Sequence, residues 1–518
     1  MSELLRTKPL DRIMAEAEQH GEHTLRRALG PFNLIMIGIG AIIGTGIFVL
    51  TGQAAATNAG PAIVISFTLA GIGCTFAGLC YAEFASLIPI AGSAYTYGYA
   101  TLGEIFAWII GWDLVLEYAF GAATVASGWS GYFVSFLRDF NIQVPPQWTA
   151  TPGTELLLFQ GRWSPLNTIQ TSLQSAGVSA ASLPHVTANF NLVALVAIAI
   201  VTVVLVIGVR ESANLNSAMV AIKVGVVFVF IGLATSYVLK NTEVAAQHWH
   251  PFIPPNAGHF GEFGWSGIAR GAAVIFFAYI GFDAVSTTAQ EAKNPQKDMP
   301  IGIIGSLVIC TVLYIVVAAL LTAIVPYKIL NVADPVAVGV DAIGVHWGSV
   351  MVNGGVVAGL ASVMLVMLLG QSRVLYSMSK DGLLPKWASD IHPRFRTPWI
   401  TSIVVGVFAA VFASVLNIRD LSALVNIGTL LAFVIVCFGV WTLRVRRPDL
   451  HRPFKTPLVP VIPILGALIS FGMMASLPLA TWVRLLVWLV IGLFIYFFYS
   501  RHHSLVGKSP SPPPRVRE

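Results

Sequence analysis

The sequence predicts an all-α integral membrane protein with about twelve transmembrane helices. We expect a five-plus-five inverted repeat with discontinuous helices 1 and 6, followed by two extra C-terminal helices. Three observations lead to this fold class. Of the 518 residues, 56% are hydrophobic and only 10% are charged, which is too apolar for a soluble protein of this size. Apolar residues gather into runs of bilayer length, and two of these runs contain helix-breaking residues.

Twelve apolar runs reach the length that a membrane-spanning helix needs, roughly 20 residues for about 30 Å of hydrocarbon. They are residues 32–56, 61–89, 104–137, 190–209, 213–239, 267–290, 300–325, 348–378, 398–416, 420–443, 457–476 and 480–500. The inverted-repeat core is expected at 32–443, with repeats at about 32–239 and 267–443. A cytosolic loop and helices 11 and 12 follow at 444–500.

The two ends of the chain are polar. Residues 1–31 mix charges with short apolar pieces and lack a signal-peptide core, so we expect a cytosolic N-terminal extension. Residues 501–518 are rich in Pro and Ser and predict a disordered cytosolic tail. Lys and Arg are concentrated in the segments on the side of the N-terminus, which places both termini in the cytosol. Residues 139–188 carry little charge and predict a surface loop on the outer face.

The first apolar run contains the stretch GIGAIIGTG, residues 38–46, which places four glycines in nine residues. Each interior glycine costs about 0.5–1 kcal/mol of helix stability relative to alanine. A dinucleotide-binding G-x-G-x-x-G finger is rejected, because the spacing misses by one residue and no soluble βαβ unit follows. Two compatible interpretations remain. One is a helix-packing face at Gly40-x-x-x-Gly44, and the other is a helix break whose free N–H groups bind an anion.

The sixth run holds a second interruption. In AAVIFFAYIGFDAVSTT, residues 272–288, Gly281 and Asp283 lie in mid-run. An ionisable residue at that depth in a membrane suggests a function. Breaks in two helices that are five apart are typical of inverted-repeat transporters, which bind their solute between the discontinuous helices. The two breaks therefore predict a transporter with a solute site near the middle of the membrane.

Several short sequences resemble the amino acid-polyamine-organocation superfamily of transporters. They are GAIIGTGIF at 40–48, CYAEF at 80–84 and GSAYTY at 92–97. Others are similar to its cationic amino acid transporter branch: FFAYIGFD at 276–283, DGLLP at 381–385, IGTLLAF at 427–433 and RPD at 447–449. The matches run in order from about residue 25 to 456.

This resemblance implies a secondary active transporter that imports L-amino acids across the plasma (inner) membrane by proton symport and alternating access. Protons would be the coupling ion, with no sodium, no metal and no organic cofactor. The partners would be the amino acid and membrane lipids, with no nucleic acid. Two alternatives stay open: an amino acid exchanger without obligatory proton coupling, and a non-transporting amino acid sensor. Whether the substrate is cationic or neutral is also open.

The resemblance also implies the substrate-binding residues. The α-carboxylate would bind backbone N–H groups at the first break, those of Ile43, Gly44, Thr45 and Gly46. The α-ammonium would bind carbonyl oxygens at the second break, those of Phe277, Ala278 and Ile280, with the Phe277 ring as a gate over the substrate. Physical chemistry favours this division, since small residues admit a ligand to the backbone and a helix N-terminus attracts negative charge.

Lys223 lies about ten residues into the fifth run, about two to three turns from its end, or roughly 15 Å at 1.5 Å per residue. Snorkelling to the interface is one explanation, although the depth makes it unfavourable. Removal from water favours the neutral form of an amine, so this side chain is a candidate for exchanging a proton. The resemblance implies a lysine that replaces a sodium ion and contacts carbonyls of Ile42 or Ile43 and the hydroxyl of Ser362.

Carboxylates in the third and sixth runs complete the candidate site. Asp113 and Glu117 lie four residues apart on one helical face, where two charged carboxylates would repel each other. We expect Glu117, one turn deeper, to join the polar network and the proton coupling, whereas Asp113 could instead cap or pair near the outer loop. Asp283 follows the second break and is expected to hold its geometry or to favour a cationic side chain.

The remaining candidates predict structural roles. Glu83 and Arg270 lie near span ends, where pairing or interface anchoring is expected. His185, His248 and His250 lack metal-ligand spacing. All four cysteines fall in apolar runs and predict neither disulfides nor a metal cluster. The sequence has no H-E-x-x-H, G-x-S-x-G or P-loop motif, so we expect no enzyme.

Overall fold

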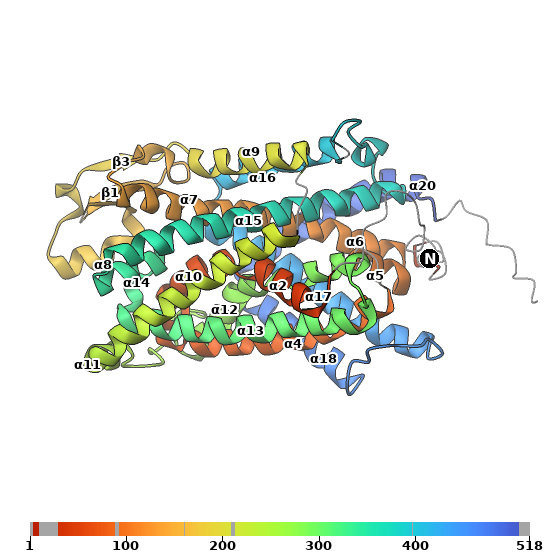
Figure 1. Cartoon of the computed structure of the whole chain (residues 1–518), viewed down its shortest axis with the longest axis horizontal. Coiled ribbons are helices and arrows are strands. Elements are labelled where there is room, and N and C mark those ends of the chain that lie inside the picture. Colours follow the sequence, from red (N-terminus) through yellow and green to blue (C-terminus); the bar gives the residue numbers. More distant parts are fainter. Residues whose placement is uncertain are drawn as a thin grey trace, which may run out of the picture.

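The computed structural model describes residues 4–9, 29–88, 93–159, 161–208, 213–395 and 397–506. In this part of the chain, eight helical stretches are long and apolar enough to cross a membrane: Gly46–Leu87, Glu104–Asp139, Met219–Lys240, Gly264–Ser286, Pro295–Ile324, His346–Lys380, Ile418–Arg446 and Leu479–His503. Shorter apolar helices cover Pro31–Ile42, Leu192–Ile207, Trp399–Val415 and Val461–Ser476. The chain is therefore a mostly helical, multi-pass membrane protein (Figure 1).

Helices occupy the predicted runs along the whole described chain. Three of the shorter ones, α9 (Leu192–Ile207), α16 (Trp399–Val415) and α18 (Val461–Ser476), have 16 or 17 residues. At 1.5 Å per residue they are about 24–26 Å long. This is a little less than the roughly 30 Å of a hydrocarbon core, so a total of twelve crossings stays a prediction.

Two groups of helices form the body of the protein (Figure 1). In the first group, α13 (Pro295–Ile324) packs along α2 (Pro31–Ile42) and along α4 (Ile63–Leu87). In the second group, α15 (His346–Lys380) packs along α7 (Gly121–Asp139), and α16 packs along α9. Helices that are distant in the sequence are therefore neighbours in space.

Two further helices contact both groups. α10 (Ala213–Lys240) touches α2 and α13 on one side and α15 on the other. α17 (Ile418–Arg446) touches α4, α7 and the π-helix Leu116–Phe120. A side chain on the inner face of either helix can therefore reach the space between the two groups.

The remaining helices and turns complete the described chain. The helices are α3 (Thr51–Ala54), α5 (Ser93–Thr101), α6 (Glu104–Val115), α8 (Leu166–Ala176), α11 (Thr242–His248), α12 (Gly264–Ile275), α14 (Pro335–Ile343), α19 (Leu479–Ile495) and α20 (Arg501–His503). The π-helical segments are Gly46–Leu50, Ala55–Ala59, Leu116–Phe120 and Tyr496–Ser500. The 3₁₀ segments are Gly60–Ala62, Pro146–Trp148, Ala180–Ser182, Phe276–Tyr279, Asp283–Glu291, Tyr327–Ile329 and Lys386–Ser389.

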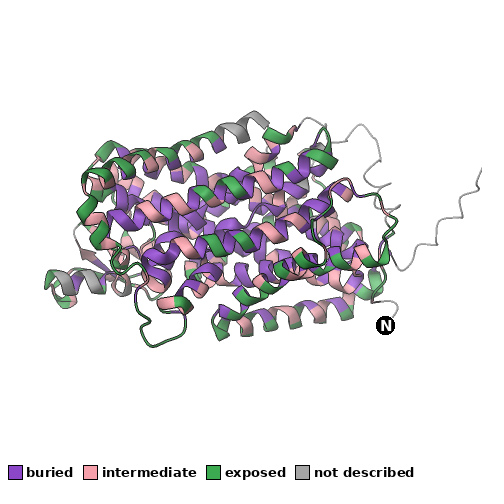
Figure 2. Ribbon diagram, turned by 90° about the horizontal axis from the view of Figure 1, so that it is seen from below, coloured by how far each residue is buried: buried purple, intermediate pink, exposed green. Residues whose placement is uncertain are grey.

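Buried residues lie in the interior of the helical body, and exposed residues lie on its outside and in its loops (Figure 2). The buried hydrophobic residues form one large core that runs through the helices. Large apolar side chains also point outward, including Ile200, Val407 and Val490 at 59%, 59% and 65% exposure. Such a surface is unfavourable in water and suits the hydrocarbon of a bilayer.

The segment 139–188, predicted as a surface loop, contains a small sheet. β1 (Glu155–Phe159), β2 (Arg162–Pro165) and β3 (His185–Thr187) are antiparallel and lie in the order β2-β1-β3. In register, Leu157 pairs with Ser164 on one side and with His185 on the other. The all-α prediction is therefore wrong in this segment. Strands of three to five residues are too short for a clear period-2 pattern in the sequence.

The described parts near both ends of the chain lie on one face of the protein, here called the terminal face (Figure 1). The N–H of Glu104 donates to the Arg6 carbonyl (3.1 Å), and that of Leu505 donates to the Asp381 carbonyl (3.0 Å). The sheet, α8, α11 and α14 lie at the opposite end, here called the loop face. Most of the predicted N-terminal extension and residues 507–518 of the predicted tail lie outside the described residues.

Candidate solute-binding site

The first break occupies residues 43–45, between α2 and the π-helix Gly46–Leu50. Ile43 adopts an extended conformation (φ −71°, ψ 103°), and its N–H still donates to the Ile39 carbonyl (2.9 Å). Among the described residues, no backbone carbonyl accepts a hydrogen bond from the N–H groups of Gly44, Thr45 or Gly46. Of the four N–H groups expected to bind a carboxylate, three therefore lack a backbone acceptor, whereas that of Ile43 is engaged.

The second break covers residues 276–282. α12 ends at Ile275 and is followed by a 3₁₀ turn and then by an extended residue, Ile280 (φ −62°, ψ 133°). Gly281 has φ +119°, a backbone conformation that residues other than glycine rarely adopt. The Phe277 carbonyl accepts from the Ile280 N–H (3.2 Å), whereas the Ile280 carbonyl has no donor among the described residues. This break therefore presents at least one free acceptor oxygen.

The two breaks are in direct contact through glycines. A Cβ on Gly46, directly after the first break, would overlap the Cα and Cβ atoms of Ala278 in the second break. A Cβ on Gly281 would lie 2.8 Å from both the carbonyl carbon and the carbonyl oxygen of Ala41 at the end of α2. Each break therefore contributes one glycine whose missing side chain lets the other backbone approach. The expected N–H donors and the expected carbonyl acceptors face a common region.

Tyr314 of α13 joins the two breaks by hydrogen bonds. Its fully buried hydroxyl lies 2.8 Å from the carbonyl oxygen of Ile42 and 2.8 Å from that of Ala278. Carbonyls in the last turn of a helix have no partner within that helix, so a side-chain donor there removes an energetic cost. No sequence pattern indicated this role, because a single tyrosine in an apolar run is most often a packing residue.

Lys223 supplies a second donor to the end of α2. The side chain is 1% exposed, and its Nζ donates to the Gly40 carbonyl (2.7 Å). The expected acceptors were the carbonyls of Ile42 or Ile43, and the structure shows Gly40 in their place. The reason is local: Tyr314 already donates to Ile42, and Gly40 is the carbonyl in the last turn of α2 that Lys223 reaches.

A glycine of α15 makes room for this lysine. A Cβ on Gly359 would lie 2.8 Å from Cγ of Lys223 and 3.5 Å from Cδ and Cε. The hydroxyl of Ser362 donates to the Gly359 carbonyl within the same helix (2.9 Å). The lysine stem therefore passes directly over α15, and the hydrogen bond of Ser362 goes to its own helix rather than to the Lys223 ammonium.

The predicted carboxylates lie deep in the protein. Asp113, Glu117 and Asp283 are 1%, 1% and 0% exposed. Asp283 accepts hydrogen bonds from the Tyr118 hydroxyl (2.9 Å) and from the N–H of Gly281 (3.3 Å). Its position directly after the second break, with a hydrogen bond to Gly281, therefore agrees with a role in holding that break. Glu117 lies on the π-helix Leu116–Phe120, and its carboxyl interacts electrostatically with that of Asp283.

Several buried polar atoms have no hydrogen-bond partner among the described residues. Glu117 Oε1, both carboxylate oxygens of Asp113 and the hydroxyls of Thr45 and Thr429 have no hydrogen-bond partner among the described residues. Buried polar groups are normally paired, so each such atom indicates a place for a polar solute or a water molecule. The pairing that was considered for Asp113 near the outer loop is not present in the described residues.

Residues expected at span ends have structural partners. Arg444 makes a two-point ion pair with Glu83, with Nε–Oε1 and Nη2–Oε2 distances of 2.8 and 2.9 Å. Arg452 lies 3.3 Å from the same carboxylate. Arg270 donates to the Ser476 carbonyl (2.6 Å). These contacts support the structural roles predicted for Glu83 and Arg270.

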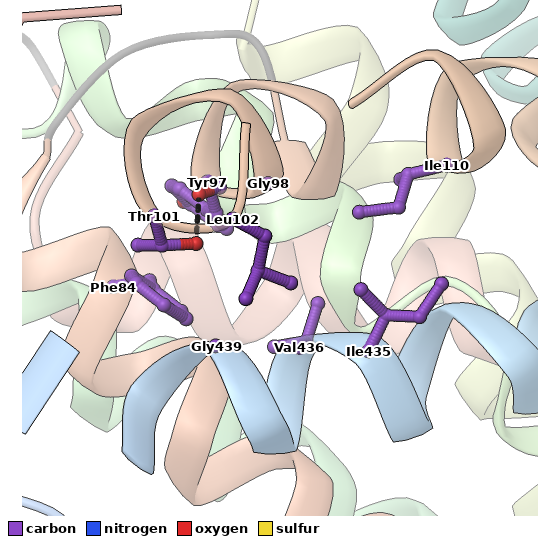
Figure 3. Close-up of a pocket in the computed structure, with 9 residues that line it drawn as sticks. All are labelled: Phe84, Tyr97, Gly98, Thr101, Leu102, Ile110, Ile435, Val436 and Gly439. Carbon is purple, nitrogen blue, oxygen red and sulfur yellow. Dashed lines mark hydrogen bonds between the residues drawn. The ribbon is translucent and has the colours of Figure 1, made fainter. Parts of the chain in front are cut away.

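A small apolar pocket lies between α5 and α17 (Figure 3). Its lining includes Phe84, Leu102, Ile110 and Val436. The hydroxyl of Thr101 donates to the carbonyl of Tyr97 in its own helix (2.7 Å). None of the lining residues carries a charge. The pocket therefore offers no charged group to a solute, and the contact region of the two breaks remains the candidate site.

The chain is similar in sequence to several known membrane transporters. Residues 29–505 match the family described as amino acid permease. Two similar relatives come from Bacillus subtilis (strain 168): a branched-chain amino acid permease, BcaP, 44% identical over 98% of this chain and 99% of the relative, and a methylthioribose transporter, 42% identical over 98% and 100%. The vacuolar cationic amino acid transporter 4 of Arabidopsis thaliana is 30% identical over 99% and 98%.

Proposed function

The chain belongs to the amino acid permease family and is therefore a membrane transporter of amino acids or related solutes, not an enzyme, and we propose that it imports L-amino acids by proton symport. Import would proceed across the plasma membrane by alternating access around the two breaks. The terminal face would then be cytosolic, and the two repeats would span about 32–239 and 267–443.

One observation carries this proposal: the contact between two backbone breaks of opposite character. Gly44, Thr45 and Gly46 offer N–H groups that have no backbone acceptor, and Ile280 offers a carbonyl without a donor among the described residues. An amino acid has a carboxylate for the first set and an ammonium for the second. The Phe277 ring, 4% exposed and adjacent to Ala278, would gate the site.

Lys223 would couple transport to protons. A protonated amine donates to the Gly40 carbonyl (2.7 Å) and so holds the end of α2 against α10 and α15. A neutral amine would hold that carbonyl more weakly, because hydrogen bonds from charged donors are stronger. Glu117 would take part through the polar region that it shares with Asp283. Ser362, whose hydroxyl bonds within α15, would support this step only indirectly.

The substrate side chain is the next question, and the similar relatives carry the names of different solutes. We propose a branched-chain amino acid, because the chain matches the branched-chain permease at 44% identity over almost its whole length. Methylthioribose is the second candidate, favoured by the 42% match to its transporter. That sugar derivative lacks both charges of an amino acid, so it would leave the opposed backbone sets of the two breaks unused.

Uptake into proteoliposomes tests the proposal. Labelled L-leucine should accumulate against its gradient when the vesicle interior is alkaline, and an uncoupler should abolish the accumulation. Uptake that ignores the pH gradient but requires amino acid on the opposite side would show an exchanger. Competition by the twenty amino acids and by methylthioribose at two pH values would identify the solute, and competition by methylthioribose alone would refute amino acid import.

Lys223→Ala separates coupling from binding. We expect a folded protein that binds leucine yet loses proton-driven accumulation, since the substituted side chain can neither carry a proton nor donate to the Gly40 carbonyl. Accumulation should be measured in parallel at equal and unequal pH. Normal pH-dependent accumulation by this variant would remove Lys223 from the mechanism.

A further inference from the structure

Asn426 of α17 donates two hydrogen bonds to the end of α12. Its Nδ2 lies 2.8 Å from the Ala273 carbonyl and 2.9 Å from the Val274 carbonyl. The side chain is fully buried. Ala273 and Val274 belong to the last turn of α12, which ends at Ile275. Where an α-helix changes to 3₁₀ geometry the i,i−4 bonding is interrupted, so carbonyls in the last turn gain from an external donor.

The amide oxygen of Asn426 shows that the two hydrogen bonds of Nδ2 decide the orientation of the side chain. Asn426 Oδ1 is buried and has no donor among the described residues. A reversed amide would place that oxygen against two carbonyl oxygens, which would repel it. The side chain therefore leaves one acceptor unpaired while its nitrogen holds the helix end.

The same face of α17 packs on both sides of the second break. Thr429 and Phe433 follow Asn426 at three and seven residues and lie on one side of the helix. The Phe433 ring lies 5.5 Å from the ring of Phe276, at the start of the break, and 5.1 Å from that of Phe282, at its end. α17 therefore contacts side chains at both ends of the irregular segment.

From these contacts we propose that Asn426 is a positioning residue of the substrate site, which fixes the end of α12 and so orients the carbonyls that bind the α-ammonium group. This inference rests on the proposed import of amino acids. Asn426 acts on the substrate through the backbone of residues 276–280. Loss of its two hydrogen bonds should therefore weaken recognition of the ammonium group and leave recognition of the carboxylate intact.

The test compares two ligands in Asn426→Leu, which keeps the approximate shape of the side chain and removes both donors. Affinities for L-leucine and for its 2-hydroxy analogue, which lacks the ammonium group, are measured by competition on the purified protein. We expect leucine affinity to fall by about fivefold or more and the affinity for the hydroxy analogue to change less. The preference of the protein for leucine should therefore shrink.

Asn353→Leu is the matched control. Asn353 is also an asparagine with 0% exposure, with a donating Nδ2 (2.8 Å to Asp139) and an unpaired Oδ1. It lies on α15 and contacts α7 rather than either break. We expect this variant to lose stability as Asn426→Leu does, and to keep the preference for leucine over the hydroxy analogue. The same loss of preference in both variants would overturn the inference.

Asn426→Asp gives a second measurement, which also serves if the leucine variant does not fold. A protonated carboxyl keeps one donor, so we expect a preference between that of the wild type and that of the Asn426→Leu variant. Relative to wild type, this preference should be larger at acidic pH than at alkaline pH. A wild-type preference at both pH values would refute the role of the two hydrogen bonds. Absence of amino acid uptake by the wild type would instead refute the proposed function itself.

Discussion

Lys223 packs against Gly359, whose lack of a side chain leaves room for the lysine stem. Its aliphatic stem crosses α15 at Gly359, and its Nζ reaches the Gly40 carbonyl at 2.7 Å. A lysine with 1% exposure gives up its hydration and regains only part of it from one carbonyl. At the residue scale, the position of this ammonium group therefore depends on Gly359 as much as on its acceptor.

Gly359→Ala should disturb Lys223 without removing it. The new Cβ would lie 2.8 Å from Cγ of Lys223, and such overpacking costs typically about 1–3 kcal/mol. We expect proton-driven uptake of leucine to fall several-fold while the protein stays folded, measured as initial rates in proteoliposomes.

Gly225→Ala is the control for this prediction. Gly225 lies two residues from Lys223 on the same helix, and a Cβ there meets no atom within 4 Å. Its uptake should remain close to that of the wild type. Equal uptake by the two variants would show that Lys223 tolerates displacement. The packing of the Lys223 stem over α15 would then have no effect on proton coupling.

At the scale of elements, the two broken helices are aligned by contacts that only glycine permits. Gly46 lies against Ala278, and Gly281, with φ +119°, lies against Ala41. Gly44 differs, since a Cβ there would have its nearest contact at 3.5 Å, with Val363. The four glycines that first drew attention to this helix therefore serve different purposes, and steric space distinguishes them.

Gly46→Ala and Gly44→Ala should behave differently. We expect Gly46→Ala to abolish leucine uptake, because its Cβ would overlap the backbone of Ala278 and push the breaks apart. Gly44→Ala should retain a measurable part of the leucine uptake, because the new Cβ would lie at ordinary van der Waals distances from its neighbours. Uptake and binding in vesicles with equal protein content provide the measurement, and loss of both activities in the Gly44 variant alone would contradict the assignment.

The sheet of the loop face is connected to α14 by ion pairs of Arg162 on β2. Arg162 pairs with Asp341 of α14. It also lies 3.5 Å from the carboxylate of Asp334, the residue before α14, which accepts from the hydroxyl of Ser135. The side chains of Arg162 and Asp334 are 24% and 12% exposed. The sheet thus holds α14, which packs against the π-helix Gly46–Leu50 that follows the first break.

A double-mutant cycle should detect this connection. We expect Arg162→Ala and Asp334→Ala to destabilise the protein less than additively, with a coupling energy of about 1 kcal/mol in thermal unfolding. Arg447 and Asp449 form a comparison pair at 3.0 Å whose side chains are 50% and 62% exposed. That pair should show no measurable coupling, and equal behaviour of the two cycles would mean that the sheet does not anchor α14.

For the molecule as a whole, hydropathy predicted most of the helices because a span must be apolar over bilayer length. The broken helices also followed from sequence, since Gly38–Gly46 and Gly281-Phe282-Asp283 violate helix preference where an ordinary span would obey it. The acceptor of Lys223 did not follow. It depends on which carbonyl of α2 remains free once Tyr314 has bound Ile42, and that contact arises between helices distant in the sequence.

The orientation of the whole molecule can be tested with two cysteines. The four native ones are buried at 0% exposure, so the wild type should react slowly with a maleimide that cannot cross membranes. Ser182→Cys places a thiol at an exposed position of the loop face, and Lys386→Cys places one at an exposed position of the terminal face. With the termini in the cytosol, as the distribution of Lys and Arg predicts, Ser182→Cys should react in intact cells and Lys386→Cys only after permeabilisation. The reverse pattern would invert the molecule, and the direction of transport would then have to be assigned anew, because the pH gradient would act on the opposite face.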